Sequence, residues 1–469
     1  MKRPKNVRTG RGTVRIGIVL LLASAPADAW EPQTTQAGLA EQAALASRLH
    51  KRLEDLGFTG GLYEPLTIPP ADAPDLMKAL KLLSPSEGAV PDARGRQAAI
   101  AWLDAGAALA DLPSSQAANH FFDTRTGKGW SPPERSIIDT LDDRFRQAIG
   151  RAALPDKGVP APDWVTDKQN PFNLSGFLDQ YAKAVTGSTP GERSRAMAGA
   201  LVAAGAMLHV LGDLGSPSRV RSDEAAHLDP LGGGADDLGS RFERIAALTY
   251  GRLGVPAPAR TITRTHLRDY FTAPDGTGLA DVIAKTYFSP NTLPESTRVN
   301  DAPPKLVRAK PALPAKLNLM AAGREDGTTL RNADGTCLAR YRIDHSVITW
   351  SLDDDCMLEQ LAVIMPEVAA YETGLLDFLL RGELALAVDQ GQVTVSSKGL
   401  GAGTIDILVE DDRGVRTSIG KSALSGGPAQ DQLAKVAMPT YGTRVVAVFS
   451  GADQAGEPIV AVGALPLTH

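Results

Sequence analysis

The residues of this chain best suited to chemistry are a histidine and an aspartate four positions apart, His209 and Asp213. They close an Ala-rich stretch, 195–214, whose composition favours a helix. Residues i and i+4 share one face of a helix, so the imidazole and the carboxylate project side by side. Such a pair either binds a metal ion or forms a buried hydrogen bond that stabilises the fold.

Further residues upstream offer chemistry of the same kind. Asp111 and His120 supply a second carboxylate and a second imidazole. Trp30 directly follows Ala27-Asp28-Ala29, an A-x-A pattern typical of a signal-peptidase site. Cleavage there would make Trp30 the first residue, whose free α-amino group and carbonyl oxygen can chelate a metal. The alternative for Trp30 is an exposed aromatic residue near a flexible terminus.

Taken together, these residues resemble the secreted zinc-dependent phospholipases C and the fungal-type single-strand nucleases. The resemblance covers about residues 30–380 and implies a helical fold with up to three zinc ions, one of them bound through a mature N-terminal Trp. The metal ligands that it implies in this sequence are Trp30, Asp111, His120, His209, Asp213 and Glu243. Four of these, from Asp111 to Asp213, would complete one tetrahedral zinc site.

Three positions depart from the family pattern. Gln36, Arg219 and Gly239 stand where the resemblance implies histidine ligands. Gln is a poor zinc ligand, and Arg cannot be one because its guanidinium stays protonated. The sites implied around Trp30 and Glu243 are therefore incomplete.

Arg219 has two interpretations. Its guanidinium could clamp a phosphate where a metal ion would otherwise stand, which would make Arg219 and Asp111 the catalytic residues beside a zinc-bound hydroxide. The commoner arrangement is a structural ion pair, here with Glu243. His227, in a Gly- and Asp-rich loop, is expected at the surface, with a substitute ligand as the alternative.

These residues support three hypotheses of function. The first is a secreted zinc-dependent phosphodiester hydrolase of phospholipase C type, with reduced metal content, acting on a phospholipid or another phosphoester. The second is a catalytically degenerate exported binding or scaffold protein that keeps one structural zinc. The third, a single-strand nuclease, needs aromatic stacking platforms and a basic groove, and the sequence carries no strong signal for either.

Residues 1–29 are typical of a secretory signal, with six basic residues before a short apolar run at 16–23. We therefore expect a periplasmic or extracellular protein, with an uncleaved membrane anchor as the alternative. Without this segment the chain has 43 Lys and Arg against 53 Asp and Glu, a net charge of −10, which disfavours bulk binding to nucleic acid. No later stretch is expected to be long enough to cross a membrane.

The elements that must position these residues form an expected helical domain, 30–380. Helical patterns cover 35–56, 95–109, 134–152, 236–253, 279–287 and 358–380. A capping box from Thr189 to Glu192 begins the helix that carries His209, which should end near 215–217. In the 236–253 helix the residues expected to face inward are Phe242, Ile245, Leu248 and Thr249. Pro-rich stretches at 155–171 and 301–315 indicate a loop and a linker.

After residue 380 the pattern changes to short apolar runs, several of them alternating, that are typical of a small β-sandwich, 381–469. The expected strands are 384–388, 392–396, 404–409, 435–438, 444–449 and 458–462. Cys337 and Cys356 are the two cysteines of the chain, and in an exported protein they should form a disulfide that staples short strands around an Asp334-Gly335 turn. The expected fold class is thus mainly α, with a phospholipase C/nuclease-type helical domain followed by a β-sandwich. The sequence does not indicate an oligomeric state.

Overall fold

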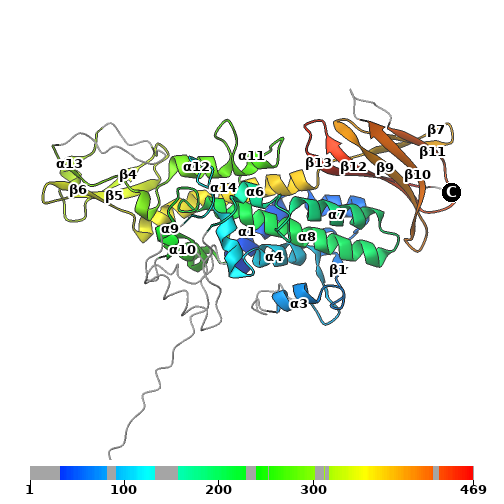
Figure 1. The fold of residues 1–469 in the computed structure, drawn as a ribbon, viewed down its shortest axis with the longest axis horizontal. Coiled ribbons are helices and arrows are strands. Elements are labelled where there is room, and N and C mark those ends of the chain that lie inside the picture. Colours follow the sequence, from blue (N-terminus) through cyan, green and yellow to red (C-terminus); the bar gives the residue numbers. More distant parts are fainter. Residues whose placement is uncertain are drawn as a thin grey trace, which may run out of the picture.

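A computed structural model of the chain is an elongated molecule with helices in the middle and strands at both ends (Figure 1). It describes residues 32–81, 91–131, 157–228, 239–251, 253–300, 311, 316–425 and 433–467. The expected signal segment, Trp30, the expected helix 134–152 and nearly all of the expected linker 301–315 lie outside the described residues.

The middle of the molecule is built from long helices that pack on one another. They are α1 (Ala37–Ala46), α2 (Leu49–Leu56), α4 (Ala99–Leu109), α7 (Leu174–Thr186), α8 (Pro190–Gly212) and α14 (Asp354–Leu379). The shorter helices are α3 (Pro74–Leu80), α6 (Ala161–Trp164), α9 (Glu224–Leu228), α10 (Arg241–Tyr250), α11 (Arg268–Phe271), α12 (Leu279–Thr286) and α13 (Leu319–Ala322). Short 3-10 helices are η2 (Gly61–Tyr63), η4 (Ser114–His120), η5 (Asp213–Gly215) and η6 (Pro290–Thr292), and η1 (Pro32–Gln36) is a π-helical segment that leads into α1.

Helix α8 is the central helix of this group. It begins at Thr189 with both halves of the predicted capping box formed, and its α-helical part ends at Gly212, just before the turn η5. By length and composition the segment 190–215 is apolar enough to cross a membrane, so the expectation that no later stretch is long enough is wrong. Its most apolar window is 94% buried inside the protein, as in the core helix of a folded domain.

Two glycines let α8 lie unusually close to α4. A Cβ on Gly106 would overlap the carbonyl oxygen of Val202, and a Cβ on Gly205 would overlap that of Leu103. Backbone-to-backbone approach of this kind is possible only without side chains at the contact. It brings the end of α4 beside the end of α8, where the candidate site lies.

Several element boundaries differ from the sequence expectation. The predicted 35–56 helix is broken at Ser47 into α1 and α2, and the predicted 95–109 helix begins with a short strand, β2 (Arg96–Ala98), which pairs with β1 (Pro65–Thr67). The expected 155–171 loop contains the short helix α6. The inward orientation predicted for Leu248 and Thr249 is wrong: Leu248 is 82% exposed, because α10 buries only its Phe242 side against α14.

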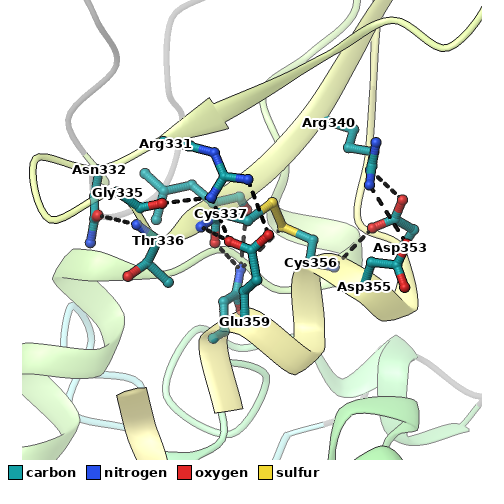
Figure 2. The surroundings of a disulfide bond; sticks show 12 residues. Arg331, Asn332, Gly335, Thr336, Cys337, Arg340, Asp353, Asp355, Cys356 and Glu359 are labelled. Carbon is teal, nitrogen blue, oxygen red and sulfur yellow. Dashed lines mark hydrogen bonds and ion pairs between the residues drawn. A yellow bond between two sulfur atoms is a disulfide. The ribbon is translucent and has the colours of Figure 1, made fainter. Parts of the chain in front are cut away.

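A small antiparallel sheet forms one end of the molecule, in the order β3 (Thr297–Arg298), β6 (Val347–Ser351), β5 (Cys337–Asp344) and β4 (Thr328–Arg331). The predicted Cys337–Cys356 disulfide is formed and ties β5 to the first turn of α14. Figure 2 shows this junction, in which Glu359 of α14 accepts a hydrogen bond from the backbone N of Cys337. The disulfide thus attaches the small sheet to the helical core.

The opposite end is a sandwich of two antiparallel sheets. One has the order β11 (Ala434–Ala437), β8 (Gln392–Ser396), β7 (Ala385–Asp389). The other has the order β10 (Arg416–Ser425), β9 (Leu400–Glu410), β12 (Arg444–Asp453), β13 (Pro458–Pro466). Alternate residues of the strands, such as Val395, Ile407 and Phe449, fill a core between the sheets. The sequence predicted all of these strands except β10.

Within the larger sheet, β12 and β13 are buried on both faces over residues 445–449 and 459–462. Val446, Val448, Val460 and Val462 point away from the sandwich core and join the core of the helical part, where β12 and β13 contact α7. A polar contact lies at the same boundary, since the buried Arg416 donates to the backbone carbonyls of Val185 and Leu56. The strands therefore read as continuous apolar runs because they have two apolar neighbours.

Candidate metal centre

The predicted ligands come from the ends of three neighbouring elements. Asp111 lies two residues beyond the end of α4, His120 is the last residue of η4, and His209 and Asp213 straddle the end of α8. The close packing of α4 on α8 brings these ends together. All four side chains are buried, with Asp111 the most exposed at 5%.

The four side chains converge on one point. Nδ1 of His120 lies 2.8 Å from Oδ2 of Asp213 and 3.1 Å from Oδ1 of Asp111. Nε2 of His209 lies 3.2 Å from Oδ2 of Asp111 and 3.3 Å from Oδ2 of Asp213. One nitrogen or oxygen from each residue falls within 4.8 Å of those of the other three.

These separations suit a tetrahedral metal ion. Zinc bonds of about 2.0–2.1 Å in a tetrahedron place neighbouring ligand atoms about 3.3 Å apart. Nε2 of His209 and both oxygens of Asp111 form no hydrogen bond among the described residues, although they lie at contact distance. Nδ1 of His120 and Oδ2 of Asp213 are hydrogen bonded to each other at 2.8 Å, whereas the remaining ligand atoms lie close together without bonding. Two imidazoles with two carboxylates are a donor set that zinc takes.

The tautomer of His209 strengthens this interpretation. Its Nδ1 lies 2.6 Å from the carbonyl oxygen of Ala107, which can only accept, so Nδ1 must carry a proton and donate it. Nε2 then faces Asp111 and Asp213 either as the second N–H of a charged ring or as a lone pair with a metal ion between it and the carboxylates. A backbone carbonyl that orients a metal-bound histidine in this way is common around metal sites.

The ionisable groups show the same demand for positive charge. Burial alone would lower the pKa of His209, but the charges of Asp111 and Asp213 raise it well above its usual range. Burial alone would raise the pKa of Asp111, but the two imidazoles hold it well below its usual range. The cluster therefore stabilises either a proton or a metal ion at the same place.

Arg219 and Glu243 form a buried ion pair. Nε of Arg219 lies 2.8 Å from Oε1 of Glu243, and Nη1 lies 3.3 Å from Oδ2 of Asp213. The guanidinium also stacks over the ring of Phe121, 4.7 Å from its centroid. Of the two interpretations of Arg219, the structure contains the ion pair. The guanidinium of Arg219 thus lies between Glu243 and Asp213, one of the four converging residues.

Glu243 has a second structural role in its own helix. Its Oε2 accepts a hydrogen bond of 2.7 Å from the backbone N of Ser240, which completes a capping box at the start of α10. Gly239, where the resemblance implies a histidine, lies just before this cap. His227, expected at the surface, is fully buried, with its ring packed on Phe121 and Nδ1 3.9 Å from Oε2 of Glu243. The expectation of exposure is wrong because His227 belongs to the helix α9, which turns its ring onto Phe121.

Gln36 lies on the other side of Asp213. Its Nε2 donates a hydrogen bond of 2.8 Å to Oδ1 of Asp213, so its amide positions the carboxylate that would otherwise be free on that side. Trp30, the last predicted ligand, lies outside the described residues.

Glu372 is an acidic residue of the site that was not predicted from the sequence. It is fully buried on α14, and neither carboxylate oxygen has a hydrogen-bond partner among the described residues. Burial, together with the charge of Asp213, raises its pKa well above the usual range, while His209 lowers it. A glutamate inside an otherwise apolar stretch, 368–376, is the signal that could have marked it.

Comparison with known proteins adds little to this geometry. No protein-family model matches the chain, and no curated protein matches it. Among solved structures, the alpha toxin from Clostridium absonum is 14% identical, with 94% of this chain and 97% of the toxin covered and a TM-score of 0.28. The alpha-toxin of Clostridium perfringens from the avian strain SWCP is 11% identical, with 94% and 100% covered and a TM-score of 0.27.

Proposed function

We propose that this chain is an exported metal-binding protein in which Asp111, His120, His209 and Asp213 hold one zinc ion in a closed, structural site. The observation that carries the proposal is the convergence of four buried donor groups that crowd together without hydrogen bonds from Nε2 of His209 or from either oxygen of Asp111. A bound zinc would supply the positive charge that these two carboxylates and two imidazole lone pairs need. The function of the protein would then be that of a binding or scaffold module built on this helical frame.

The closed character of the site favours a structural over a catalytic role. Structural zinc sites use four protein ligands, whereas catalytic sites keep one position open for water or substrate. Here each of the four groups is at most 5% exposed. Arg219 already supplies a positive charge beside Asp213, at the place where the family resemblance implies a further metal ligand.

Phosphodiester hydrolysis of phospholipase C type is the second candidate function. The observation that favours it is Nη2 of Arg219, which has no hydrogen-bond partner among the described residues although Nε and Nη1 do. A guanidinium with a free N–H beside a metal site can bind a phosphate oxygen. Arg219 would then hold the phosphoester, with Asp111, the most exposed of the four ligands, as the catalytic carboxylate. A single-strand nuclease gains no specific support.

The decisive experiment measures zinc and activity in the same preparation of the exported, processed protein. We expect about one zinc ion per chain by mass spectrometry, and a fall in the free energy of unfolding of about 4 kcal/mol on chelation if zinc is present at about a thousand times its Kd. His209→Ala should remove the zinc and lower the Tm, whereas His345→Asn, at an exposed histidine, should change neither.

The outcomes separate the two functions. Zinc retention with no cleavage of phosphatidylcholine or single-stranded DNA supports the structural site. Zinc-dependent cleavage of phosphatidylcholine that His209→Ala abolishes would refute the structural role and establish the hydrolase function. Absence of zinc, with no thermal response to chelation, would refute both.

A further inference from the structure

A groove follows the line where α7 packs on α8, on the side of the helical part where α3 stands at its edge (Figure 1). Its two halves have volumes of about 690 Å³ and about 410 Å³, and they adjoin because both are lined by Leu76, Gln180 and Gly199. Ligand-binding pockets of proteins have volumes of about 300–1,000 Å³. The groove is therefore large enough for a small-molecule ligand.

The smaller half of the groove is apolar. Four of the side chains that line it are only partly buried where they pack against the main core, namely Leu76, Ala79, Leu112 and Phe172. Val202 and Ala203 of α8 line the same half. Apolar surface left open in a concave place favours an apolar ligand, which removes that surface from water.

The larger half of the groove is polar and contains one cation without a partner. Asp72 and Arg195 form an ion pair there, and Glu192 is engaged in the capping box that begins α8. The ammonium group of Lys183, in the last turn of α7, has neither an ion pair nor a hydrogen bond within the described part of the chain. An anionic group in this half would therefore be attracted to Lys183.

The two halves orient a ligand that has one charged end and one apolar end. Asp75 borders the apolar half, so an anionic head group is disfavoured there. Gln180 lies where the halves meet, and its side-chain amide makes no hydrogen bond to any described residue. Arg195, in the polar half, precedes His209 by 14 residues on α8, which is about 21 Å along the helix. The head group would thus lie far from the candidate metal centre.

We propose that this groove binds a free fatty acid, with its carboxylate beside Lys183 and its hydrocarbon chain in the apolar half. Burial of the chain against the partly exposed apolar side chains supplies the affinity, and the ammonium group selects an anionic head. The inference is independent of the proposed zinc site, because none of the four converging residues lines the groove. It goes beyond the proposed function by giving the exported binding module a ligand.

The test titrates the full processed protein with dodecanoate, below its critical micelle concentration, by isothermal titration calorimetry. Dodecyltrimethylammonium has the same chain with a positive head and is the matched ligand. We expect dodecanoate to bind at one site per chain and dodecyltrimethylammonium to bind about tenfold more weakly. Lys183→Glu should remove this preference, whereas Lys285→Glu, at an exposed lysine in the last turn of α12, should keep it.

A second set of variants fills the groove without changing its charge. Gly199→Leu adds a side chain at a position where a Cβ would contact only the side chain of Gln180, at 3.4 Å or more, and it should abolish dodecanoate binding. Gly191→Leu, at an open position of the same helix, is the control and should bind as the wild type does. Leu favours helix over Gly, so both variants should fold, which their Tm values check. If Gly199→Leu does not fold, Gly176→Leu in the apolar half replaces it.

Three results would overturn the inference. The first is the absence of saturable dodecanoate binding by the wild type, including the case in which the protein sediments with phosphatidylglycerol vesicles instead and so binds a membrane surface. The second is equal binding of dodecanoate by a folded groove-filling variant and by Gly191→Leu. The third is equal affinity of the wild type for the two head groups, which would remove Lys183 from the site.

Discussion

Replacing Arg219 by Met should destabilise the protein strongly, because it leaves two buried carboxylates without their guanidinium. Arg219 is fully buried, 2.8 Å from Oε1 of Glu243 and 3.3 Å from Oδ2 of Asp213. Removing one partner of a buried ion pair costs about 3–5 kcal/mol. The interaction of two unit charges 4 Å apart, about 4 kcal/mol at an effective dielectric constant of about 20, falls in the same range. We expect the free energy of unfolding to fall by about 3–5 kcal/mol.

The size of the effect can be assigned to charge by a double-mutant cycle. Glu243→Gln removes the negative charge but keeps an oxygen that can accept from the backbone N of Ser240. The double variant Arg219→Met/Glu243→Gln should therefore be less destabilised than the sum of the single variants, by about 1–3 kcal/mol. Arg268→Met, at an exposed pair with Asp163, is the control and should change stability by less than about 0.5 kcal/mol.

Bound zinc should change the loss of stability that Arg219→Met causes. Asp213 belongs both to the ion pair and to the proposed zinc site, so a bound zinc would neutralise it when Arg219 is absent. The penalty of Arg219→Met should thus be larger in the presence of a chelator than in zinc. Urea unfolding followed by near-ultraviolet circular dichroism, with and without zinc, measures each value. A loss below about 1 kcal/mol together with additive single variants would refute the assignment of Arg219 as a charge-balancing group.

Three further predictions concern the frame around the site. Gly205→Ala should separate α8 from α4 and cost about 1–3 kcal/mol in urea unfolding, whereas the open position Gly191→Ala should not destabilise the protein. Burial would raise the pKa of Glu410, but Arg444 and Arg416 lower it, so its stabilising effect is complete above about pH 4.3 and is lost as the pH falls through the lowered pKa. Glu410→Gln should therefore destabilise at pH 7 and flatten the acid limb of the stability curve, and an unchanged acid limb would contradict this. The variant Cys337→Ser/Cys356→Ser should lose about 3 kcal/mol, and reductant should lower the Tm of the wild type but not of this variant.

The sequence predicted the elements whose signals are local. The helix that carries His209 begins at the predicted capping box, because Thr189 and Glu192 satisfy backbone donors that lie within four residues of each other. The alternating apolar runs after residue 380 are strands because each has one or two apolar neighbours. β10 was not predicted because it is an edge strand rich in small and polar residues. It forms through its pairing with β9, which the local sequence does not indicate.

The site was predicted less completely, because some of its residues are far apart in the sequence and meet only in the folded structure. His209 and Asp213 are linked by helical spacing, but Asp111 and His120 join them only because two glycines bring α4 onto α8. Glu372 lies 159 positions after Asp213, and the apolar stretch around it marks it as buried without indicating that it lies beside Asp213. The prediction that Leu248 and Thr249 of α10 face inward was wrong. Periodicity identifies the apolar face of a helix, but it does not indicate how much of that face a neighbouring element covers.

The arrangement of charge explains how the fold can persist while its chemistry changes. A core that holds several carboxylates needs positive charge to offset their burial. Metal ions, protons and guanidinium groups can each supply it, provided that each is hydrogen bonded or coordinated. At Arg219 a side chain supplies the charge permanently, so Glu243 and one side of Asp213 stay neutralised without any ligand. At His209 the Ala107 carbonyl holds the ring with its Nε2 toward two carboxylates, so the positive charge comes either from a proton on the ring or from a bound metal ion. The dependence of stability on metal should therefore concentrate at His209 and Asp111, and the dependence on side-chain charge at Arg219 and Glu243.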